Sequence, residues 1–385
     1  MSYVDKLLKD VEVEWKSLGE VVDMRAGQHV SASNISQTQN SEYPFPCFGG
    51  NGIRGYVVKN SHRGTHLLIG RQGALCGNVQ RFNGMFYATE HAVVVTSKGE
   101  IEIGFAFHLL TLMNLNQYAS KSAQPGLAVG RLETLKIPIP PLFVQKKIVR
   151  ILDKFTELTA ELTAELTARK KQYSYYRETL LSFNDEEVEW KTLGEIVIKS
   201  YSGSTPKADD PKYYDHGTIP WLRTQEVRFS DIENTEIKIT DLALKETAAK
   251  WIPINCVIIA ISGATAGRSA INKIPLTTNQ HCLCLEIDPQ KALYRYVFHW
   301  VSLNYEKLKA LGQGARGDLN SAIIKSYKIP IPQIREQEHI VAILDKFDML
   351  TTSISEGLPK EIELRKKQYE YYRDLLLTFP KNNIE

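Results

Sequence analysis

The sequence predicts an α+β protein with a pseudo-two-fold internal repeat, in which two domains of short strands and helices are separated by two long helices packed as an antiparallel coiled coil. Three observations support this prediction. Several phrases occur twice, among them VEWKSLGE from Val13 and VEWKTLGE from Val188, and ILDKF from Ile151 and again from Ile343. Each copy has a segment rich in strand and turn signals, and each ends in a long segment with helical periodicity.

The two copies agree unevenly along their length. Residues 169–183 and 365–379 begin RKKQYSYYR and RKKQYEYYR, and 11 of their 15 positions are identical. Residues 67–91 and 257–281 share only 5 of 25 positions. The helical ends of the two copies were thus conserved, while the mixed segments diverged. This pattern is expected of a protein that performs one kind of recognition on two different targets.

The mixed segments predict two α+β domains, which we bound at residues 1–141 and 185–332. Short β-branched runs punctuated by Gly, Asn, Ser and Pro are typical of short strands joined by turns. Such runs fall at residues 55–59, 66–70, 92–96 and 256–261. Residues 109–118 and 294–308 are expected to form helices near the end of each domain.

A first long spacer helix is predicted over residues 142–184. The heptad pattern of a coiled coil is nearly unbroken over five heptads. Its a positions are Ile148, Phe155, Leu162, Arg169, Tyr176 and Phe183, and its d positions are Leu152, Thr159, Leu166, Tyr173 and Leu180. Pro140 and Pro141 mark the start, because proline is tolerated in a first turn and disfavours helix upstream. At about 1.5 Å per residue the helix would span about 60 Å, which favours a spacer.

A second long helical region is predicted over residues 333–385, broken near 357–359. Its a positions Ile340, Phe347 and Ile354 and its d positions Leu344, Thr351 and Leu358 precede a four-residue slip of register. The slip coincides with Gly357 and Pro359, residues that end helices or restrict the preceding residue, so we expect a break or sharp kink there. The first helix instead repeats TAEL at residues 159–162 and 163–166, units of about one turn that can be gained or lost while the helix stays continuous.

The two long helices are expected to pack on each other. If the copies are related by an approximate two-fold axis, the helices run antiparallel and the two domains lie at opposite ends of a shared stalk. The alternative is that each helix packs on its own domain. We favour the antiparallel pair because so long a heptad seam needs a partner of similar length.

Bulk properties exclude several classes of protein. With 385 residues and 43% hydrophobic residues the chain is expected to be globular, and no apolar run approaches the roughly 20 residues that span a bilayer. The start lacks the apolar stretch of a signal peptide, so we expect a cytoplasmic protein. The five cysteines form neither a CxxC pair nor a zinc-like cluster, and we expect no metal and no disulfide. The net charge of +3 permits a polyanionic partner without demanding one.

These features together resemble the specificity (S) subunit of a type I restriction-modification enzyme, closest to the type IC family. The likeness includes KIPIPP, the LDKF helices, the TAEL tetrads and the RKKQYxYYR ends. In the second domain it also includes GSTPKADDPKYYDHGTIPWLRT, IIAISGATAGRSAIN and TTNQH. The first domain departs from that wording, with FGGNGIRGY and LIGRQGALCGNV in the comparable places.

The resemblance implies a non-catalytic subunit that reads a bipartite double-stranded DNA target. Its two mixed domains would be target recognition domains, and the helices between them would set the gap between half-sites. It also implies assembly with two methyltransferase (M) subunits, which bring S-adenosylmethionine, and with restriction (R) subunits, which bring ATP- and Mg-dependent translocation and cleavage. Since the two domains differ so much, we expect two different half-sites and hence an asymmetric target.

Candidate DNA-binding residues are the Arg, Asn, Gln and Thr residues of the predicted loops. Arg pairs with guanine and Asn or Gln with adenine, while basic and hydroxyl groups hold phosphates. In the first domain they are Arg54, Arg63, Arg71, Gln72, Asn78, Gln80 and Arg81. In the second they are Arg223, Thr224, Gln225, Arg228, Arg268, Asn272, Asn279 and Gln280. The alternative is that such polar loop residues are simply solvated.

Candidate partner-binding residues lie on the repeated helix ends. The basic triplets Arg169, Lys170, Lys171 and Arg365, Lys366, Lys367 recur identically. A solvated helix face explains them as well as contact with spacer phosphates or a partner subunit does. Tyr175 and Tyr371 lie off the heptad seam, so we expect them to dock methyltransferase subunits.

Other motifs are discounted. Residues 50–55 fit GxGxxG, but a strand-like segment follows where a nucleotide site needs a helix. Asp215 with Glu236 and Lys238 imitates a nuclease pattern that has no copy in the first domain, and an amino-methyltransferase tetrapeptide is absent. A self-contained DNA nuclease or modification enzyme and a coiled-coil assembly protein remain the alternative functions.

Overall fold

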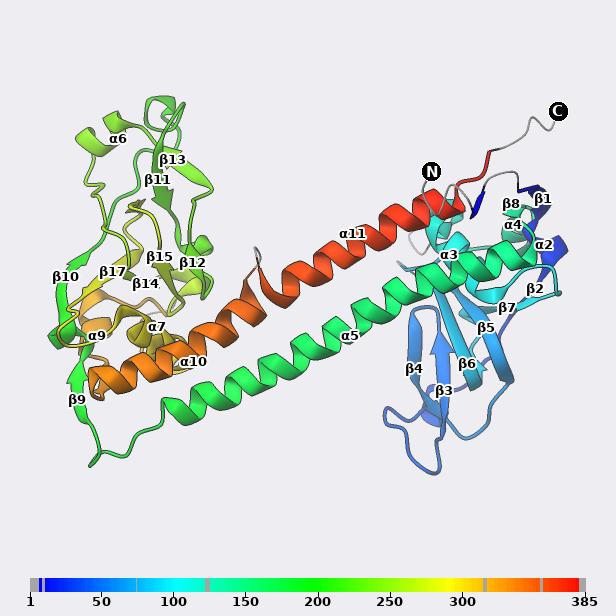
Figure 1. Ribbon diagram of the computed structural model, residues 1–385, viewed down its shortest axis with the longest axis horizontal. Helices are drawn as coiled ribbons and strands as arrows, with labels where there is room; N and C mark the ends of the chain where they lie inside the picture. The colour runs from blue at the N-terminus through cyan, green and yellow to red at the C-terminus, as the bar shows by residue number, and fades with distance from the viewer. Residues whose placement is uncertain are drawn as a thin grey trace. The chain divides into compact units, whose positions relative to one another are not determined.

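The chain folds into two compact units in the computed structural model, which describes residues 7–8, 11–73, 75–121, 125–313, 317–353 and 356–380. Unit 1 comprises Met1–Glu161 and Glu363–Glu385, and unit 2 comprises Leu162–Ile362. Strands and helices are mixed in both units, which confirms the predicted α+β class (Figure 1).

Unit 1 is built around a sheet with the strand order β2-β7-β5-β6-β3-β4. All its neighbours pair antiparallel except β3 and β6, which are parallel. The strands and helices of this unit are β1 (Glu14–Ser17), α2 (Leu18–Val21), β2 (Val22–Ala26), β3 (Phe45–Gly49), β4 (Gly52–Val57), β5 (His62–Gly70), β6 (Val79–Ala88), β7 (Ala92–Ser97), α3 (Ile103–Leu112), α4 (Val129–Glu133), β8 (Lys136–Ile139) and parts of α5 (Leu142–Leu180) and α11 (Gly357–Leu377).

The sheet of unit 1 buries apolar side chains on both faces, as the apolar run at the end of β5 requires. Leu67 and Ile69 point into a core that also contains residues of α3, α5 and α11. Leu68, between them, points to the other face and packs with Phe48 and Phe86. Alternate residues of a strand face opposite sides of a sheet, so a continuous apolar run places β5 at the centre of the unit.

Unit 2 has one sheet in the order β10-β17-β14-β15-β12 and a smaller one in the order β13-β11-β16. Its elements are β9 (Glu189–Thr192), β10 (Val197–Tyr201), β11 (Ile219–Leu222), β12 (Asp231–Ile232), β13 (Ile237–Ile239), α6 (Asp241–Glu246), β14 (Val257–Ala260), β15 (Ser269–Asn272), β16 (Thr277–Thr278), β17 (Cys282–Ile287), α7 (Tyr294–Leu303), α8 (Tyr305–Ala310), α9 (Ser321–Ser326), β18 (Lys328–Ile331), α10 (Ile334–Thr352) and the rest of α5 and α11. Buried Val257, Ile259 and Leu285 join these strands to α7 in one core.

The repeated phrases pair with each other inside each unit. Strand β1 of EWKS lies antiparallel to β8 of KIPI, with Trp15 opposite Pro138. Strand β9 of EWKT pairs in the same way with β18, with Trp190 opposite Pro330. The phrases therefore recur together because each is the other's strand partner.

A buried glutamine fixes the start of the long helix in each unit. Nε2 of Gln145 donates to the carbonyl of Pro140 at 2.7 Å, and its Oε1 accepts from the backbone of Glu102 at 2.8 Å. Gln337 makes the matching bonds to the carbonyl of Pro332 and the backbone of Leu293, both at 2.9 Å. A buried amide whose groups are all bonded ties the helix rigidly to its domain.

Each unit also packs a helix start from one copy against a helix end from the other. In unit 1, Phe155 stacks on Tyr372, and Leu152 shares the core with Leu376, so α5 and α11 run in opposite directions past each other (Figure 1). In unit 2, Phe347 of α10 stacks on Tyr173 and Tyr176 of α5.

Helix boundaries differ from the expectations where asparagines intervene. The helix expected over residues 109–118 is α3, which ends at Leu112, followed by a 3₁₀ turn over Leu115–Tyr118; Asn114 between them has a left-handed φ of 46°. The helix expected over 294–308 is divided at Asn304 into α7 and α8. The left-handed conformation of Asn114 is one that asparagine tolerates better than most other residues with a side chain.

The two long helical regions differ in continuity. Helix α5 contains both TAEL tetrads without interruption. Helix α10 ends at Thr352 and α11 begins at Gly357, whose φ is +76°. Ile354, expected at a heptad a position, lies outside the described residues.

The cysteines and the helices add two facts about the fold. Cys47, Cys76, Cys256, Cys282 and Cys284 are all buried and free. No helix among the described residues combines the length and the apolar character that crossing a membrane would take.

Candidate nucleic-acid interface

The turn after the central strand has the same backbone frame in both units. In unit 1 the amide of Arg71 donates to the carbonyl of His91 at 2.8 Å, and the amide of Gly70 donates to the carbonyl of Asn78 at 2.9 Å. In unit 2, residues 190 positions later make the same two bonds, Ile261 to His281 and Ala260 to Arg268, both at 2.9 Å. The two turns are thus equivalent in structure.

The side chains on this shared frame differ. Asn78 of unit 1 occupies the place of Arg268 of unit 2, and Arg71 occupies the place of Ile261. An amide and a guanidinium present different donor and acceptor patterns to a base edge. The same turn can therefore present different hydrogen-bonding groups at one position in the two units.

In unit 1, four of the predicted residues gather around the turn formed by residues 50–52. A Cβ on Gly49 would contact the Arg54 side chain, one on Gly50 would lie 3.1 Å from the Gln72 carbonyl, and one on Gly52 would lie 2.8 Å from Nε2 of Gln80. Arg71 precedes Gln72 directly. The glycines of this GxG sequence thus permit a close approach of backbones and side chains.

The predicted arginines of unit 1 fall into two groups. The side chains of Arg54, Arg63 and Arg71 have no hydrogen-bond or ion-pair partner within the part of the chain that the structure describes. Arg81 instead turns to the helix: its Nη2 lies 2.9 Å from Oδ1 of Asp153, and its guanidinium covers the ring of Phe107. This placement argues against a contact of Arg81 with DNA bases, because its guanidinium bonds to Asp153 and lies on the ring of Phe107.

The loop after IPWL in unit 2 carries its own carboxylates. Arg223 pairs with Glu236 at 2.7 Å and with Glu226 at 3.6 Å, and Arg228 lies 3.8 Å from Glu236. Thr224 and Gln225 form a 3₁₀ turn between them. Arg228 remains exposed, whereas Arg223 is held against the loop.

Asn272 and Asn279 have roles inside the fold. Asn272 is wholly buried: its Oδ1 accepts from the amide of Cys256 at 3.0 Å, and its Nδ2 donates to the carbonyls of Pro253 and Ile274. Because both polar atoms of the Asn272 side chain bond to backbone groups inside the fold, this placement argues against a contact of Asn272 with DNA.

Asn279 is buried as well and accepts from the amide of His281, whereas the exposed Gln280 accepts from the hydroxyl of Thr205.

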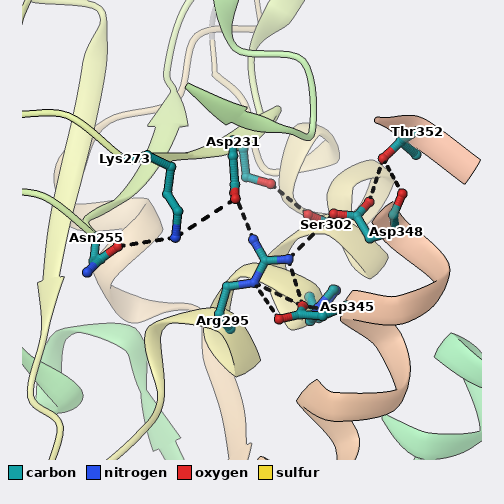
Figure 2. A network of polar contacts seen from close by, with 10 residues as sticks. Asp231, Asn255, Lys273, Arg295, Ser302, Asp345, Asp348 and Thr352 are labelled. Atoms are coloured by element: carbon teal, nitrogen blue, oxygen red, sulfur yellow. Dashed lines mark hydrogen bonds and ion pairs between the residues drawn. The ribbon is translucent and has the colours of Figure 1, made fainter. Parts of the chain in front are cut away.

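A polar cluster that we did not predict joins each domain to its long helix. In unit 2, Arg295 of α7 pairs with Asp345 of α10 at 2.6 Å and with Asp231 of β12 at 2.7 Å (Figure 2). His299 lies 2.6 Å from Asp345. Burial opposes charge on Asp345, yet the bonds from His299 and Arg295 hold the pKa of that carboxyl below its usual range. Asp348 has a raised pKa because it is buried.

The corresponding cluster of unit 1 contains Arg81, His108, Asp153 and Tyr369. Nε2 of His108 lies 2.9 Å from Asp153, and its Nδ1 lies 3.0 Å from the Tyr369 hydroxyl. Burial lowers the pKa of His108, although Asp153 acts in the opposite direction. A sequence signal existed: the dipeptide Phe-His occurs in both α3 and α7, and the aspartate belongs to the repeated ILDKF.

The candidate partner residues lie on the helix ends. Tyr175 and Tyr371 are each 65% exposed, the most exposed large apolar side chains that the structure describes. Arg169 pairs with Glu165, Arg365 bonds to Gln368, and Lys367 pairs with Glu363 on their own helices. Lys170, Lys171 and Lys366 are exposed. The described residues hold no group of three or more His, Cys, Asp or Glu side chains placed to bind a metal ion.

Comparisons with known proteins agree on one family. The profile of the type I restriction modification DNA specificity domain matches residues 10–169 and 185–364. The EcoR124I/EcoR124II specificity subunit of Escherichia coli is 39% identical over 401 aligned residues, which cover 99% of this chain and 98% of that protein. The EcoprrI specificity subunit of E. coli is 63% identical over 161 residues, 41% of this chain and 40% of that protein.

Solved structures agree in fold. The S subunit of a type I restriction-modification system from M. genitalium superposes with a TM-score of 0.70 at 16% identity, covering 99% of this chain and 100% of that one. A chain from a study of complex assembly and conformational transition of the type I system gives a TM-score of 0.54 at 14% identity, with 96% and 98% covered.

Proposed function

Because the chain belongs to the family of type I restriction-modification specificity subunits, which are non-catalytic DNA-recognition proteins, we propose that it reads an asymmetric bipartite target with one half-site per recognition domain. The recognition domains are residues 1–141 and 185–332, and helices α5, α10 and α11 set the gap. The subunit acts in the cytoplasm, where the host DNA lies.

The equivalent turns carry this proposal. A frame kept to within about 0.1 Å in two hydrogen bonds, yet bearing Asn78 in one unit and Arg268 in the other, suits two readers of one design with different targets. The kept backbone bonds preserve the turn, and the changed side chains would let each domain read a different base edge.

The repeated helix ends support docking of two methyltransferase subunits. Tyr175 and Tyr371 are equally exposed and stand in equivalent positions, so they offer the same anchor twice. Two copies of one partner would need two such surfaces. In this proposal S-adenosylmethionine, ATP and Mg belong to the M and R subunits, and the specificity subunit recognises the target sequence.

The test uses the complex with its methyltransferase subunits. Arg268→Ala should weaken binding about tenfold or more and relax base preference in one half-site only, since a good base contact discriminates by about 1–3 kcal/mol. Asn78→Ala should act on the other half-site only. Arg268→Lys keeps the charge: it should retain the salt dependence of binding while losing base discrimination. If both alanine variants altered the same half-site, or neither did, the assignment of one reader to each domain would be wrong.

A further inference from the structure

Arg295 is the centre of a polar link between the recognition domain of unit 2 and its long helix. Its guanidinium donates to Asp345 through Nε at 2.9 Å and through Nη2 at 2.6 Å, and to Asp231 through Nη1 at 2.7 Å (Figure 2). Nη2 also lies 3.5 Å from Asp348. Asp345 and Asp348 belong to α10, whereas Asp231 begins strand β12.

Asp231 connects this link to the candidate reading loop. Residues 223–228 lead into β12 within three residues, and β12 lies parallel to β15 at the edge of the main sheet. Phe229, between the loop and the strand, has a φ of +60° and packs its ring on Tyr305. The loop therefore ends close to Asp231, the first residue of β12. Arg295 bonds to this residue and also to Asp345 of the spacer helix α10.

The burial of Arg295 makes the link specific. Its side chain is 13% exposed, so the guanidinium is largely removed from water, whereas the side chains of Asp231 and Asp345 are each 34% exposed. Loss of one partner from such a group leaves an uncompensated charge, whereas replacement by a neutral group of the same shape removes mainly the orienting force. A planar guanidinium with two carboxylates on different elements fixes their angle as well as their distance.

Unit 1 achieves the same connection from other residues. Arg81 reaches Asp153 of α5 from strand β6 of the sheet itself. The place of Arg295, four residues before the histidine, is taken by Gly104, and a Cβ there would lie 2.5 Å from Nη1 of Arg81. A sheet-to-helix bridge through arginine and the ILDKF aspartate is thus present in both units although the arginine comes from different elements.

We propose that Arg295 and Asp231 are positioning residues that orient the second reading loop on its helix and thereby make the complex selective for one gap length. The inference rests on the proposed function. Base identity is set by the loop side chains, and the Asp231–Arg295–Asp345 bridge sets where that loop stands along the DNA. The bridge consists of two ion pairs, Asp231–Arg295 and Arg295–Asp345. A substitution of Asp231 therefore weakens the first pair without changing any residue of helix α10.

The experiment measures methylation by the full complex on targets whose gap is native, one base pair shorter or one longer. Asp231→Asn should reduce the discrimination against the altered gaps about tenfold, while the preferred bases of both half-sites stay unchanged. The control Glu246→Gln removes the Lys212–Glu246 pair of the same unit, at 3.1 Å, which touches neither α7 nor α10, and should leave the gap profile intact. Thermal unfolding of both variants verifies that they are folded.

The outcomes separate the two proposals. A relaxed gap profile with unchanged half-sites supports the positioning role. An unchanged profile, an equal loss at every gap, or a changed half-site preference overturns it. If the wild-type complex shows no gap preference at all, the proposed bipartite function fails first. As a second variant, Arg295→Lys keeps the charge but not the planar fork, and the proposal requires that it also relax the gap.

Discussion

The ring of Phe155 stacks on the ring of Tyr372, with centroids 5.3 Å apart and planes inclined by 18°. In the other unit, Phe347 stacks on Tyr176 at 5.4 Å and 25°. Phe155 and Phe347 end the two ILDKF phrases, and Tyr176 and Tyr372 belong to the two RKKQYxYYR phrases. Each stack therefore joins one copy of the repeat to the other, which explains why these two phrases were kept together.

The first prediction concerns these stacks. Phe155→Ala should lower the free energy of unfolding by about 2 kcal/mol, because it removes a half-buried ring and its aromatic contact. Leu364→Ala, at a position of the same helix α11 that is 48% exposed, is the control and should change it by less than about 0.5 kcal/mol. Urea unfolding of the two variants compares them, and equal midpoints would show that the stack does not stabilise unit 1.

A second prediction concerns Asn272, which the sequence placed among the DNA contacts. Asn272→Ala should destabilise the protein by about 1–3 kcal/mol, because the amide of Cys256 and two carbonyls lose their buried partner. Asn272→Asp should be at least as harmful, since a carboxylate would face the carbonyls of Pro253 and Ile274. Folded complex carrying Asn272→Ala should retain the wild-type base preference. A stable variant with an altered half-site would return Asn272 to the interface.

The dependence of stability on pH is the third prediction. Burial lowers the pKa of His108 in the folded state, so the unfolded state binds the proton first as the pH falls. The contribution of neutral His108 is fully present above the unfolded pKa of about 6.5 and is lost as the pH falls below it. The pKa of Asp153 is also lowered, so its contribution is lost only at more acidic pH, below about 4.

Unfolding free energies between pH 8 and pH 5 check this sign. The wild type should lose stability over that interval, and His108→Gln should show a shallower loss. Comparison of the two curves removes the effect of other histidines, such as His62, whose pKa burial also lowers. A steeper loss in the variant would contradict the direction given for His108.

The TAEL tetrads give the fourth prediction. Both lie within the uninterrupted helix α5, with Leu162 and Leu166 half-buried. Insertion of a third tetrad adds about one turn, roughly 6 Å, which is close to two base-pair steps of about 3.4 Å. The preferred gap should therefore lengthen while both half-sites stay the same. A changed half-site would count against the role of the helix as a spacer, and methylation assays on a gap series measure both properties.

The elements that the sequence predicted well are those with a local signature. Heptad spacing marks α5, because its signal repeats along the helix. The pairing of β1 with β8 was not predicted, because the repetition of their phrases does not say which strand lies beside which. The separate assignment of Arg81 and Arg71 could not be predicted: both are arginines in strand-and-turn sequence, and only tertiary packing directs one to Asp153.

The same limit applies to buried polar groups. Asn272 looks like a reading residue until the amide of Cys256 and its other partners are known. Likewise, the GxG at residues 50–52 resembled a nucleotide motif, whereas its glycines admit Gln80 and Gln72 at close range. Features that depend on neighbouring residues in the sequence could be predicted. The partners of side chains that meet residues of other strands could not.

The central claim is that this chain determines the DNA sequence at which a methyltransferase acts. Single-molecule methylation mapping of genomic DNA from cells that contain the methyltransferase subunits, with and without this chain, tests it most directly. The account predicts one asymmetric bipartite motif with a fixed gap, present only with the chain, and Arg268→Ala should relax one half of it. Methylation that is the same with and without the chain, or a continuous symmetric motif, would contradict the account.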